Sequence, residues 1–332
     1  MIKTISTFAL AAGTALAFSM SAAGAETLRL ATDSGAEGSP TAKSMEQWGS
    51  LIEEGTNGEL EVDIFYQNEL GGQQEVFDLF VAGDVDMMIN WPMTSYDQRI
   101  AIVYAPYMVF SWEEAKEAYE PGGWINEMMD GIYQDNGLKF FGAWPEGFNG
   151  VATKGEYATT IEKAGDLKVR VPPAFPHAET VQAMGYDTAT IDWSEVFTAI
   201  ETGVVDGDAA NVIYWDYEYF RDTLDYYVRT KHAFITGVIS MNLQSWDDLS
   251  EEHQQVVQEA AVTVMEDHFE AAQEIDQSYV EKAEEAGMTY IEPSDEEIKA
   301  LAEAVRAEVW PQMEEEVGSE IMDTVRENAS EL

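Results

Sequence analysis

The sequence of 332 residues contains no cysteine, which excludes disulfide frameworks, thiolate metal sites and a cysteine nucleophile. Its four histidines do not form H-E-x-x-H or another metal-ligating spacing. A nucleophile-elbow serine motif is also missing, and Gly71-Gly72 has neither the lysine nor the spacing of a phosphate-binding loop. These absences favour a binding protein over an enzyme, with no cofactor and no metal.

Long apolar segments are missing as well, apart from an alanine-rich run over residues 8–20. This run follows Lys3 and precedes Ala23-Gly24-Ala25, which is the order of charge, apolar run and small-residue site in a signal peptide. The run is too short to span a bilayer. We expect residues 1–25 to be cleaved after export to the periplasm. An uncleaved anchor helix is the alternative, although small residues dominate the run instead of Leu and Ile.

Positive charge is scarce. The chain has 17 Lys and Arg against 63 Asp and Glu, so its formal net charge is -46. Nucleic acid and anionic membrane surfaces would be repelled, and neither is expected as a partner. Because hydrophobic residues make up 45% and aromatic residues 11%, the chain should fold around a core and not form a disordered acidic tail.

The acidic surplus also predicts a salty environment. In dilute buffer such a charge destabilises the compact state, whereas at about 1 M salt the Debye length falls to about 3 Å and the repulsion is screened. We therefore interpret the protein as halophilic. An ordinarily acidic periplasmic protein is the alternative.

Short apolar strand patterns alternate with helical patterns along most of the chain. Strands are predicted at residues 27–31, 60–66, 85–89, 138–143 and 167–171, and helices at residues 41–54, 112–136 and 193–202. This alternation predicts an α/β protein with a largely parallel sheet. The length suggests about two domains, and because no low-complexity linker is present we expect ordinary strands to join them.

Two helices are predicted near the C-terminus. The longer one runs from Ser250, its N-cap, to residue 286, and Gly287 ends it. The second begins at Ser294, with Glu297 three residues later in the spacing of a capping box.

Trp and Tyr residues are enriched where predicted strands end. Open α/β sheets bind ligands beyond the carboxyl ends of their strands, and aromatic rings there supply apolar and cation-π contacts. Packing in a core or at a hinge is the alternative for each ring. The residues are Trp91, Trp144, Trp193, Tyr214, Trp215 and Tyr217.

Five motifs follow one another along the chain after the predicted signal peptide. They are residues 68–72 with 81–86, Leu167-Lys168-Val169-Arg170-Val171-Pro172, residues 193–197, residues 202–207, and His232 with Asn242 and residues 246–250. In this order they resemble the solute-binding subunit of tripartite ATP-independent periplasmic (TRAP) transporters, the family of C4-dicarboxylate and sialic acid binders. The resemblance covers essentially the whole mature chain.

The resemblance implies a two-lobed fold of the periplasmic-binding-protein kind, with a ligand cleft between the lobes and a long C-terminal helix spanning both. Lobe I would comprise residues 26–148 and about 236–280, and lobe II residues 149–235 and about 281–332. The family function would be to capture a small molecule and deliver it to TRAP membrane permease subunits. A sensory domain or an enzyme on the same fold is the alternative class.

The family also implies a ligand site around Arg170, where the guanidinium clamps a carboxylate through two charge-assisted hydrogen bonds. An ion pair with a surface carboxylate is the alternative role for Arg170. This chain has Asn149 where many relatives carry a further arginine, and the family's asparagine is lost or shifted to Asn211. The expected ligand contacts are Arg170, Asn149, Trp91, Trp193, Asp208, Asn211 and Trp215.

Three classes of ligand fit this set of residues. A small monocarboxylate needs one positive group and ranks first. An amine, zwitterion or osmolyte in the aromatic box, with Asp208 nearby, ranks second. A dicarboxylate ranks third, because its second charge would have no arginine.

Overall fold

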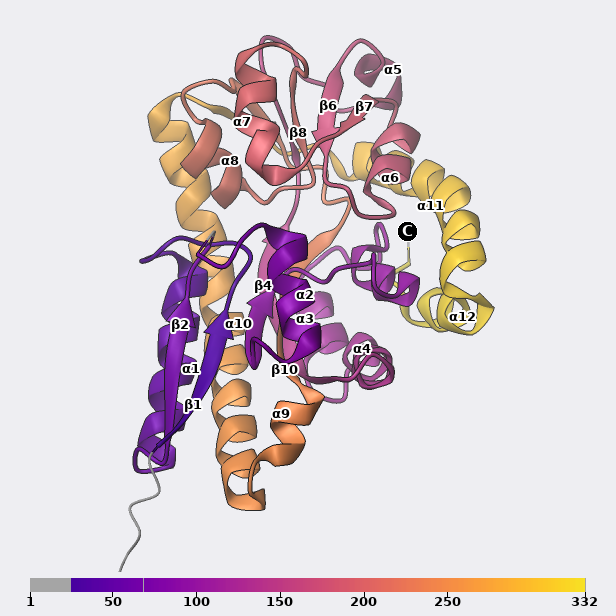
Figure 1. The fold of residues 1–332 in the computed structure, drawn as a ribbon. Helices are drawn as coiled ribbons and strands as arrows, with labels where there is room; N and C mark the ends of the chain where they lie inside the picture. The colour runs from indigo at the N-terminus through magenta and orange to yellow at the C-terminus, as the bar shows by residue number, and fades with distance from the viewer. Residues whose placement is uncertain (1–24, 68, 332) are drawn as a thin grey trace, which may run out of the picture.

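The computed structural model describes residues 25–67 and 69–331, which fold around two β-sheets placed one above the other (Figure 1). Of the predicted signal peptide, only Ala25 lies within these residues, and Asn68 of the first motif also lies outside them. Both sheets are flanked by helices, which confirms the α/β class and the two-lobed fold.

The first sheet has the strand order β2-β1-β3-β10-β4. Strand β1 pairs in parallel with β2 and β3, whereas β10 runs antiparallel to β3 and β4. The strands are β1 (Glu26–Ala31), β2 (Leu60–Phe65), β3 (Met87–Asn90), β4 (Leu138–Phe148) and β10 (Phe234–Asn242).

The second sheet has the strand order β11-β9-β5-β8-β6-β7. Here β5 runs antiparallel to both of its neighbours, and the other pairs are parallel. The strands are β5 (Val151–Thr153), β6 (Lys168–Val171), β7 (Asp187–Thr190), β8 (Gly207–Ala209), β9 (Tyr226–Val228) and β11 (Thr289–Ile291).

Each sheet is therefore mixed, and the prediction of a largely parallel sheet was too simple. The antiparallel strands are β5, which enters the second sheet from β4, and β10, which returns to the first sheet from β9. Strands β5 and β10 each begin at the edge of their sheet that faces the other sheet. The neighbouring strands end at that edge, so β5 and β10 run antiparallel to them. As a result, the carboxyl ends of β1, β3 and β4 face those of β6, β7 and β8.

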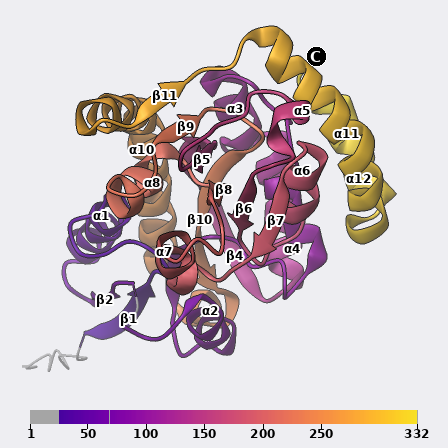
Figure 2. The ribbon, with the colours of Figure 1, turned by 90° about the horizontal axis from the view of Figure 1, so that it is seen from above.

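The helices cover the faces of both sheets (Figures 1 and 2). They are α1 (Pro40–Gly55), α2 (Gln73–Ala82), the 3₁₀ helix η1 (Gln98–Tyr104), α3 (Trp112–Tyr119), α4 (Trp124–Asp135), α5 (Ile161–Ala164), α6 (His177–Ala183), α7 (Trp193–Glu201), α8 (Ile213–Phe220), α9 (Leu243–Asp248), α10 (Glu251–Ala286), α11 (Asp295–Val317) and α12 (Ser319–Asn328).

Helix α10 packs on α1 and β4 in the lobe of the first sheet, and on α8 and β11 in the lobe of the second sheet. This confirms the predicted long helix along both lobes. Ser250 caps its start by accepting a hydrogen bond from the backbone of His253, and Gly287, with φ 100°, ends it in the left-handed conformation. The chain then passes through β11 of the second sheet and reaches α11 on the other side of the molecule from α10 (Figures 1 and 2). Ser294 and Glu297 form the predicted capping box of α11.

The C-terminal segment, which we expected in lobe II, contacts both parts of the molecule. Helix α11 packs on η1 and α6, and α12 packs on α4.

The single helix predicted over residues 112–136 is two helices, so this prediction was wrong. Helix α3 ends at Tyr119, and Pro121, Gly122 and Gly123 separate it from α4. The residue before a proline is disfavoured in helical conformation, and Gly122 takes φ 87°.

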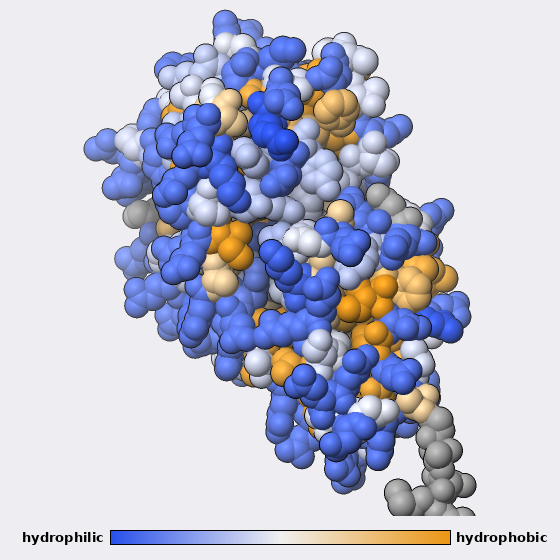
Figure 3. Space-filling view, turned by 90° about the vertical axis from the view of Figure 1, so that its left-hand side faces the viewer, coloured by the Kyte–Doolittle hydropathy of each residue, from blue (hydrophilic) through white to orange (hydrophobic). Residues whose placement is uncertain are grey.

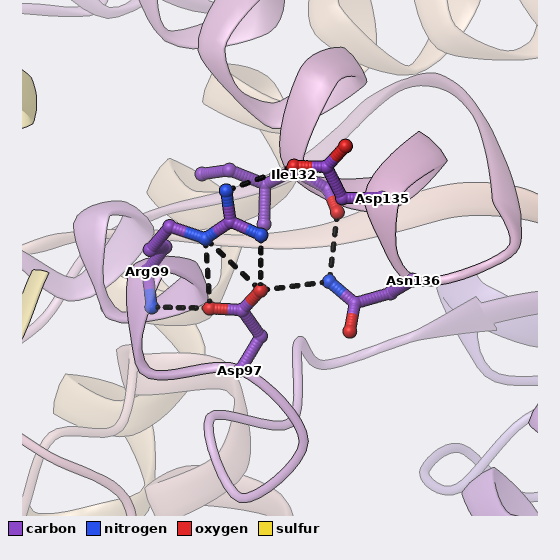
Figure 4. Close-up of polar contacts among 5 residues, drawn as sticks. All are labelled: Asp97, Arg99, Ile132, Asp135 and Asn136. Atoms are coloured by element: carbon purple, nitrogen blue, oxygen red, sulfur yellow. Dashed lines mark hydrogen bonds and ion pairs between the residues drawn. The ribbon is translucent and has the colours of Figure 1, made fainter.

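A polar cluster fixes η1 against the end of α4 (Figure 4). Asp97 caps η1 by accepting the backbone N–H of Arg99 at 2.9 Å, and Arg99 Nη1 lies 2.9 Å from Asp135 Oδ2. Asn136 donates to Asp97 Oδ2 at 2.9 Å. The Arg99 guanidinium lowers the pKa of Asp97 to about 2. This cluster anchors one end of the segment between β3 and η1, which lines the site described next.

Candidate functional site

A cavity of about 260 Å³ lies between the carboxyl ends of the two sets of strands. From the first sheet it is lined by Ser34 after β1, Trp91 after β3 and Glu146 near the end of β4. The second sheet contributes Arg170 from β6 and Asn211 after β8. Further lining residues include Gln73, Gln74, Thr94, Ser95, Tyr104, His177, Asp192, Trp193, Ala210 and Trp215. Five of the expected contacts therefore meet here: Arg170, Trp91, Trp193, Asn211 and Trp215.

Arg170 is 3% exposed, and its guanidinium is held from two sides. Nε donates to the backbone oxygen of Ile191 at 2.8 Å, and Nη1 lies 3.3 Å from Asp208 Oδ2. The guanidinium carbon is 5.6 Å from the centroid of the Trp193 ring. Within the described part of the chain, Nη2 makes no hydrogen bond, so a fixed cation keeps one terminal nitrogen for a ligand.

Asp208 is fully buried behind Arg170 and is not among the residues that line the cavity. Burial raises its pKa to about 6, although the neighbouring Arg170 lowers it. Next to it, Asp216 accepts a hydrogen bond from Asn211 Nδ2 at 3.1 Å, and burial raises the pKa of Asp216 well above its usual value. The two carboxyls therefore serve to position Arg170 and Asn211.

Three tryptophans form one aromatic group in the cavity. The Trp215 ring lies edge-on to both others, with centroids 5.2 Å from Trp91 and 5.8 Å from Trp193. Trp91 follows β3 of the first sheet, whereas Trp193 lies in α7 and Trp215 in α8, so the group brings together cavity-lining rings from three separate elements.

Packing is the role of the other aromatic residues that end strands. Trp144 stacks on His268 at 4.0 Å and donates from Nε1 to Ser44 Oγ at 2.9 Å. Tyr214 and Tyr217 lie edge-on to Tyr279 of α10, at 4.8 and 5.6 Å.

Asn149 lies outside the cavity lining and is fully buried. Its Nδ2 donates to His232 Nε2 at 2.8 Å, and its Oδ1 accepts the backbone N–H of Ala233 at 2.8 Å. These contacts join the connection between β4 and β5 to the connection between β9 and β10. Asn149, which the resemblance suggested as a ligand contact, thus lies in the connections between the sheets and outside the cavity lining.

Glu146 lines the cavity and was not found from the sequence. Both of its carboxylate oxygens accept from Trp215 Nε1, at 3.1 and 3.2 Å. Burial raises the pKa of Glu146 well above its usual value, and the charge of nearby Asp33 raises it further. An acidic residue two positions after Trp144 in an apolar strand was the available signal, but 63 acidic residues made it inconspicuous.

His177 also lines the cavity, where its ring lies 4.7 Å from that of Tyr104. Burial, with a smaller effect of Arg170, lowers the pKa of His177 to about 3, so it is neutral near pH 7. Arg170 is thus the one positively charged side chain of the lining.

Within residues 25–67 and 69–331, no three His, Asp or Glu side chains converge in a way that would hold a metal ion. None of the helices in this part of the chain is both long and apolar enough to cross a membrane.

The family model of bacterial extracellular solute-binding protein, family 7 (DctP) matches residues 31–316. The chain belongs to this family. This confirms the relationship to TRAP solute-binding subunits expected from the motifs, and it confirms a binding protein and not an enzyme.

The family 7 protein is similar to the ectoine-binding periplasmic protein TeaA of Halomonas elongata, with 28% identity over 209 residues. That match covers 62% of this chain and 61% of TeaA, so the aligned segment spans about three fifths of the relative. Among solved structures, the ectoine-binding protein of the TeaABC TRAP transporter from Halomonas elongata has a TM-score of 0.83 at 24% identity, covering 91% of this chain and 99% of that one. A TRAP solute-binding protein from Chromohalobacter salexigens with bound D-glucuronate has a TM-score of 0.83 at 21% identity, covering 91% and 98%. At these identities the two structures support the fold.

Proposed function

We propose that this family 7 protein captures a small organic acid, a monocarboxylate, in the cavity between its sheets and delivers it from the periplasm to the membrane permease subunits of a TRAP transporter. The observation that carries the proposal is Arg170, a buried guanidinium with Nη2 unengaged in a cavity of about 260 Å³. A charge-assisted hydrogen bond to a carboxylate is the contact that such a group makes best.

The charges of the cavity support one carboxylate and not two. Among the residues that line the cavity, Arg170 is the one with a positively charged side chain, because His177 is neutral. A second carboxylate would lie near Glu146 without a cation. One of the similar proteins holds D-glucuronate and another binds ectoine, and each of these ligands carries a single carboxylate.

The test is a thermal-shift screen of organic acids, amines and osmolytes, followed by calorimetric titration of the best ligand. A ligand at 100 times its dissociation constant stabilises the native state by about 2.7 kcal/mol, which a shift in melting temperature reveals.

For Arg170→Ala we expect a loss of about 2 to 5 kcal/mol in binding, which is thirtyfold or more in affinity. Arg170→Lys should recover part of this, because an ammonium lacks the planar fork. Since Arg170→Ala leaves Asp208 buried and unpaired, the double variant Arg170→Ala, Asp208→Asn is measured beside it. Arg326→Ala, which removes the same charge from α12, is the control. Unchanged affinity in folded Arg170→Ala would reject the clamp.

A second candidate is an amine or osmolyte held by the three tryptophans without Arg170. Tryptophan faces attract cations, and the Glu146 carboxyl at the cavity wall offers two oxygens to a cationic nitrogen. Asp208, which we expected in this role, lies behind Arg170 instead. An amine that binds equally well to the wild type and to Arg170→Ala would establish this candidate.

A further inference from the structure

Glu146 lines the cavity from β4 of the first sheet, and Arg170 lines it from β6 of the second. Its two carboxylate oxygens share one donor, Trp215 Nε1. An ionised carboxylate can accept about four hydrogen bonds. Within residues 25–67 and 69–331 its side chain has no other hydrogen-bond donor and no ion pair. Most of its accepting capacity is therefore open toward the cavity.

The carboxyl of Glu146 has no counterion in the described part of the chain, and burial raises its pKa well above its usual value, which disfavours the charged form. Arg170 lies on the second sheet, where it already pairs with Asp208 of the same sheet, and His177 is neutral. Asp33, fully enclosed next to the cavity, adds a further acidic group on the side of Glu146. The ionised carboxylate is costly without a counterion, and a ligand that brings a positive charge to it would favour its ionised form and pair with it.

A simple monocarboxylate would leave this imbalance in place. It would satisfy Arg170 but leave the Glu146 carboxyl without a cation, and its own negative charge would disfavour ionisation of Glu146 further. A ligand with a negative and a positive end adds no net charge and satisfies both walls. The faces of Trp91, Trp193 and Trp215 also suit a cation.

We propose that the ligand whose carboxylate binds Arg170 also carries a cationic nitrogen that binds Glu146, so that the substrate class is a small zwitterion. This rests on the proposed function, because Arg170 is the carboxylate partner in both. Glu146 is then the residue that distinguishes amino-substituted acids from plain ones.

The test uses matched probes that differ in the cationic nitrogen alone. Proline is compared with cyclopentanecarboxylate, and a panel of small linear and cyclic amino acids with the corresponding acids that lack the amino group. Calorimetry on the wild type should show at least one zwitterion that binds roughly ten- to hundredfold more tightly than its matched acid. A panel in which no zwitterion exceeds its acid overturns the inference.

Glu146→Gln tests the residue itself. The amide oxygen can still accept from Trp215, so the shape of the site is kept while the charge is lost. The preferred zwitterion should lose roughly tenfold or more in affinity, while its matched acid binds equally well or better. Glu195→Gln removes an exposed acid of α7 outside the cavity and is the control. Urea unfolding of each variant confirms that it is folded.

The two proposals fail in different ways. If Glu146→Gln leaves the preference for the zwitterion unchanged, the role of Glu146 is overturned while the clamp at Arg170 stands. If Arg170→Ala binds both members of a pair as the wild type does, the clamp is overturned, and this inference with it.

Discussion

Asn149 Nδ2 donates a hydrogen bond to His232 Nε2 at 2.8 Å, deep between the two sheets. Because Asn149 Nδ2 can only donate, His232 Nε2 accepts and the neutral ring carries its proton on Nδ1, which lies 2.7 Å from Thr230 Oγ1. Burial lowers the pKa of His232 to about 3, which keeps the ring neutral and this arrangement intact near pH 7. The pair joins the two strand connections that cross from one sheet to the other.

We therefore predict that Asn149→Ala acts on stability. The substitution leaves His232 Nε2 and the backbone N–H of Ala233 buried without their partner, at a cost of about 1 to 3 kcal/mol in the free energy of unfolding. Urea unfolding measures it, and Asn328→Ala on the exposed surface of α12 is the control. A fully stable variant with strongly reduced ligand affinity would instead make Asn149 a direct ligand contact, as the family resemblance suggested.

The tryptophans should contribute to affinity, in part through attraction of a cationic group to their ring faces. Trp91→Ala and Trp193→Ala each remove an aromatic wall of the cavity, and we expect a loss of about 1 to 2 kcal/mol in binding for each. Calorimetric titration of the matched acid and amino acid gives both the affinity and the preference. Tyr157→Ala, which removes a ring that is 43% exposed, is the control. Affinities as high as that of the control would show that these rings do not contact the ligand.

His268 should make the stability of the protein depend on pH. Its ring stacks on Trp144, its Nε2 donates to the backbone oxygen of Pro145 at 2.8 Å, and burial lowers its pKa from 6.5 to about 4. The unfolded chain takes up this proton more readily than the native state between these values. The stabilising contribution is therefore complete above about pH 6.5 and is lost as the pH falls toward 4, by up to about 1.4 kcal/mol per pH unit.

His268→Gln checks this contribution, because glutamine can still donate to Pro145 but does not titrate. The difference in free energy of unfolding between the wild type and His268→Gln should be largest at pH 7 and should shrink steadily toward pH 4. Urea unfolding at intervals of half a pH unit measures it. A difference that stays constant over this range would contradict the assignment.

The acidic surface should make the protein more stable in salt. The formal net charge is -46, and hydrophilic side chains cover most of the face seen in Figure 3. Between about 0.1 and 1 M NaCl the Debye length falls from about 10 to about 3 Å, so repulsion among the carboxylates decreases and the unfolding midpoint should rise. Sucrose at equal osmolality separates screening from solute exclusion. Equal responses to salt and sucrose would remove the electrostatic explanation.

The sequence by itself determined the local structure of this protein. The start of α10 at Ser250, its end at Gly287 and the capping box of Ser294 and Glu297 were predicted correctly, because caps and left-handed glycines depend on residues a few positions apart. The motif around Arg170 indicated the family in the same way, since its residues are consecutive. Pro121 with its two glycines also held the signal for the break between α3 and α4, which the apolar periodicity hid.

Only the tertiary structure decided which side chains share the cavity. Trp215 and Glu146 are 69 positions apart and meet because the chain crosses from the first sheet to the second between them. Asn149 points to His232, 83 positions away, because a second crossing lies beside the first. No periodicity or cap encodes such contacts, which depend on the order and direction of strands in the sheets. Glu146 was therefore one acid among many in the sequence, and its place in the same cavity as Arg170 followed from the fold.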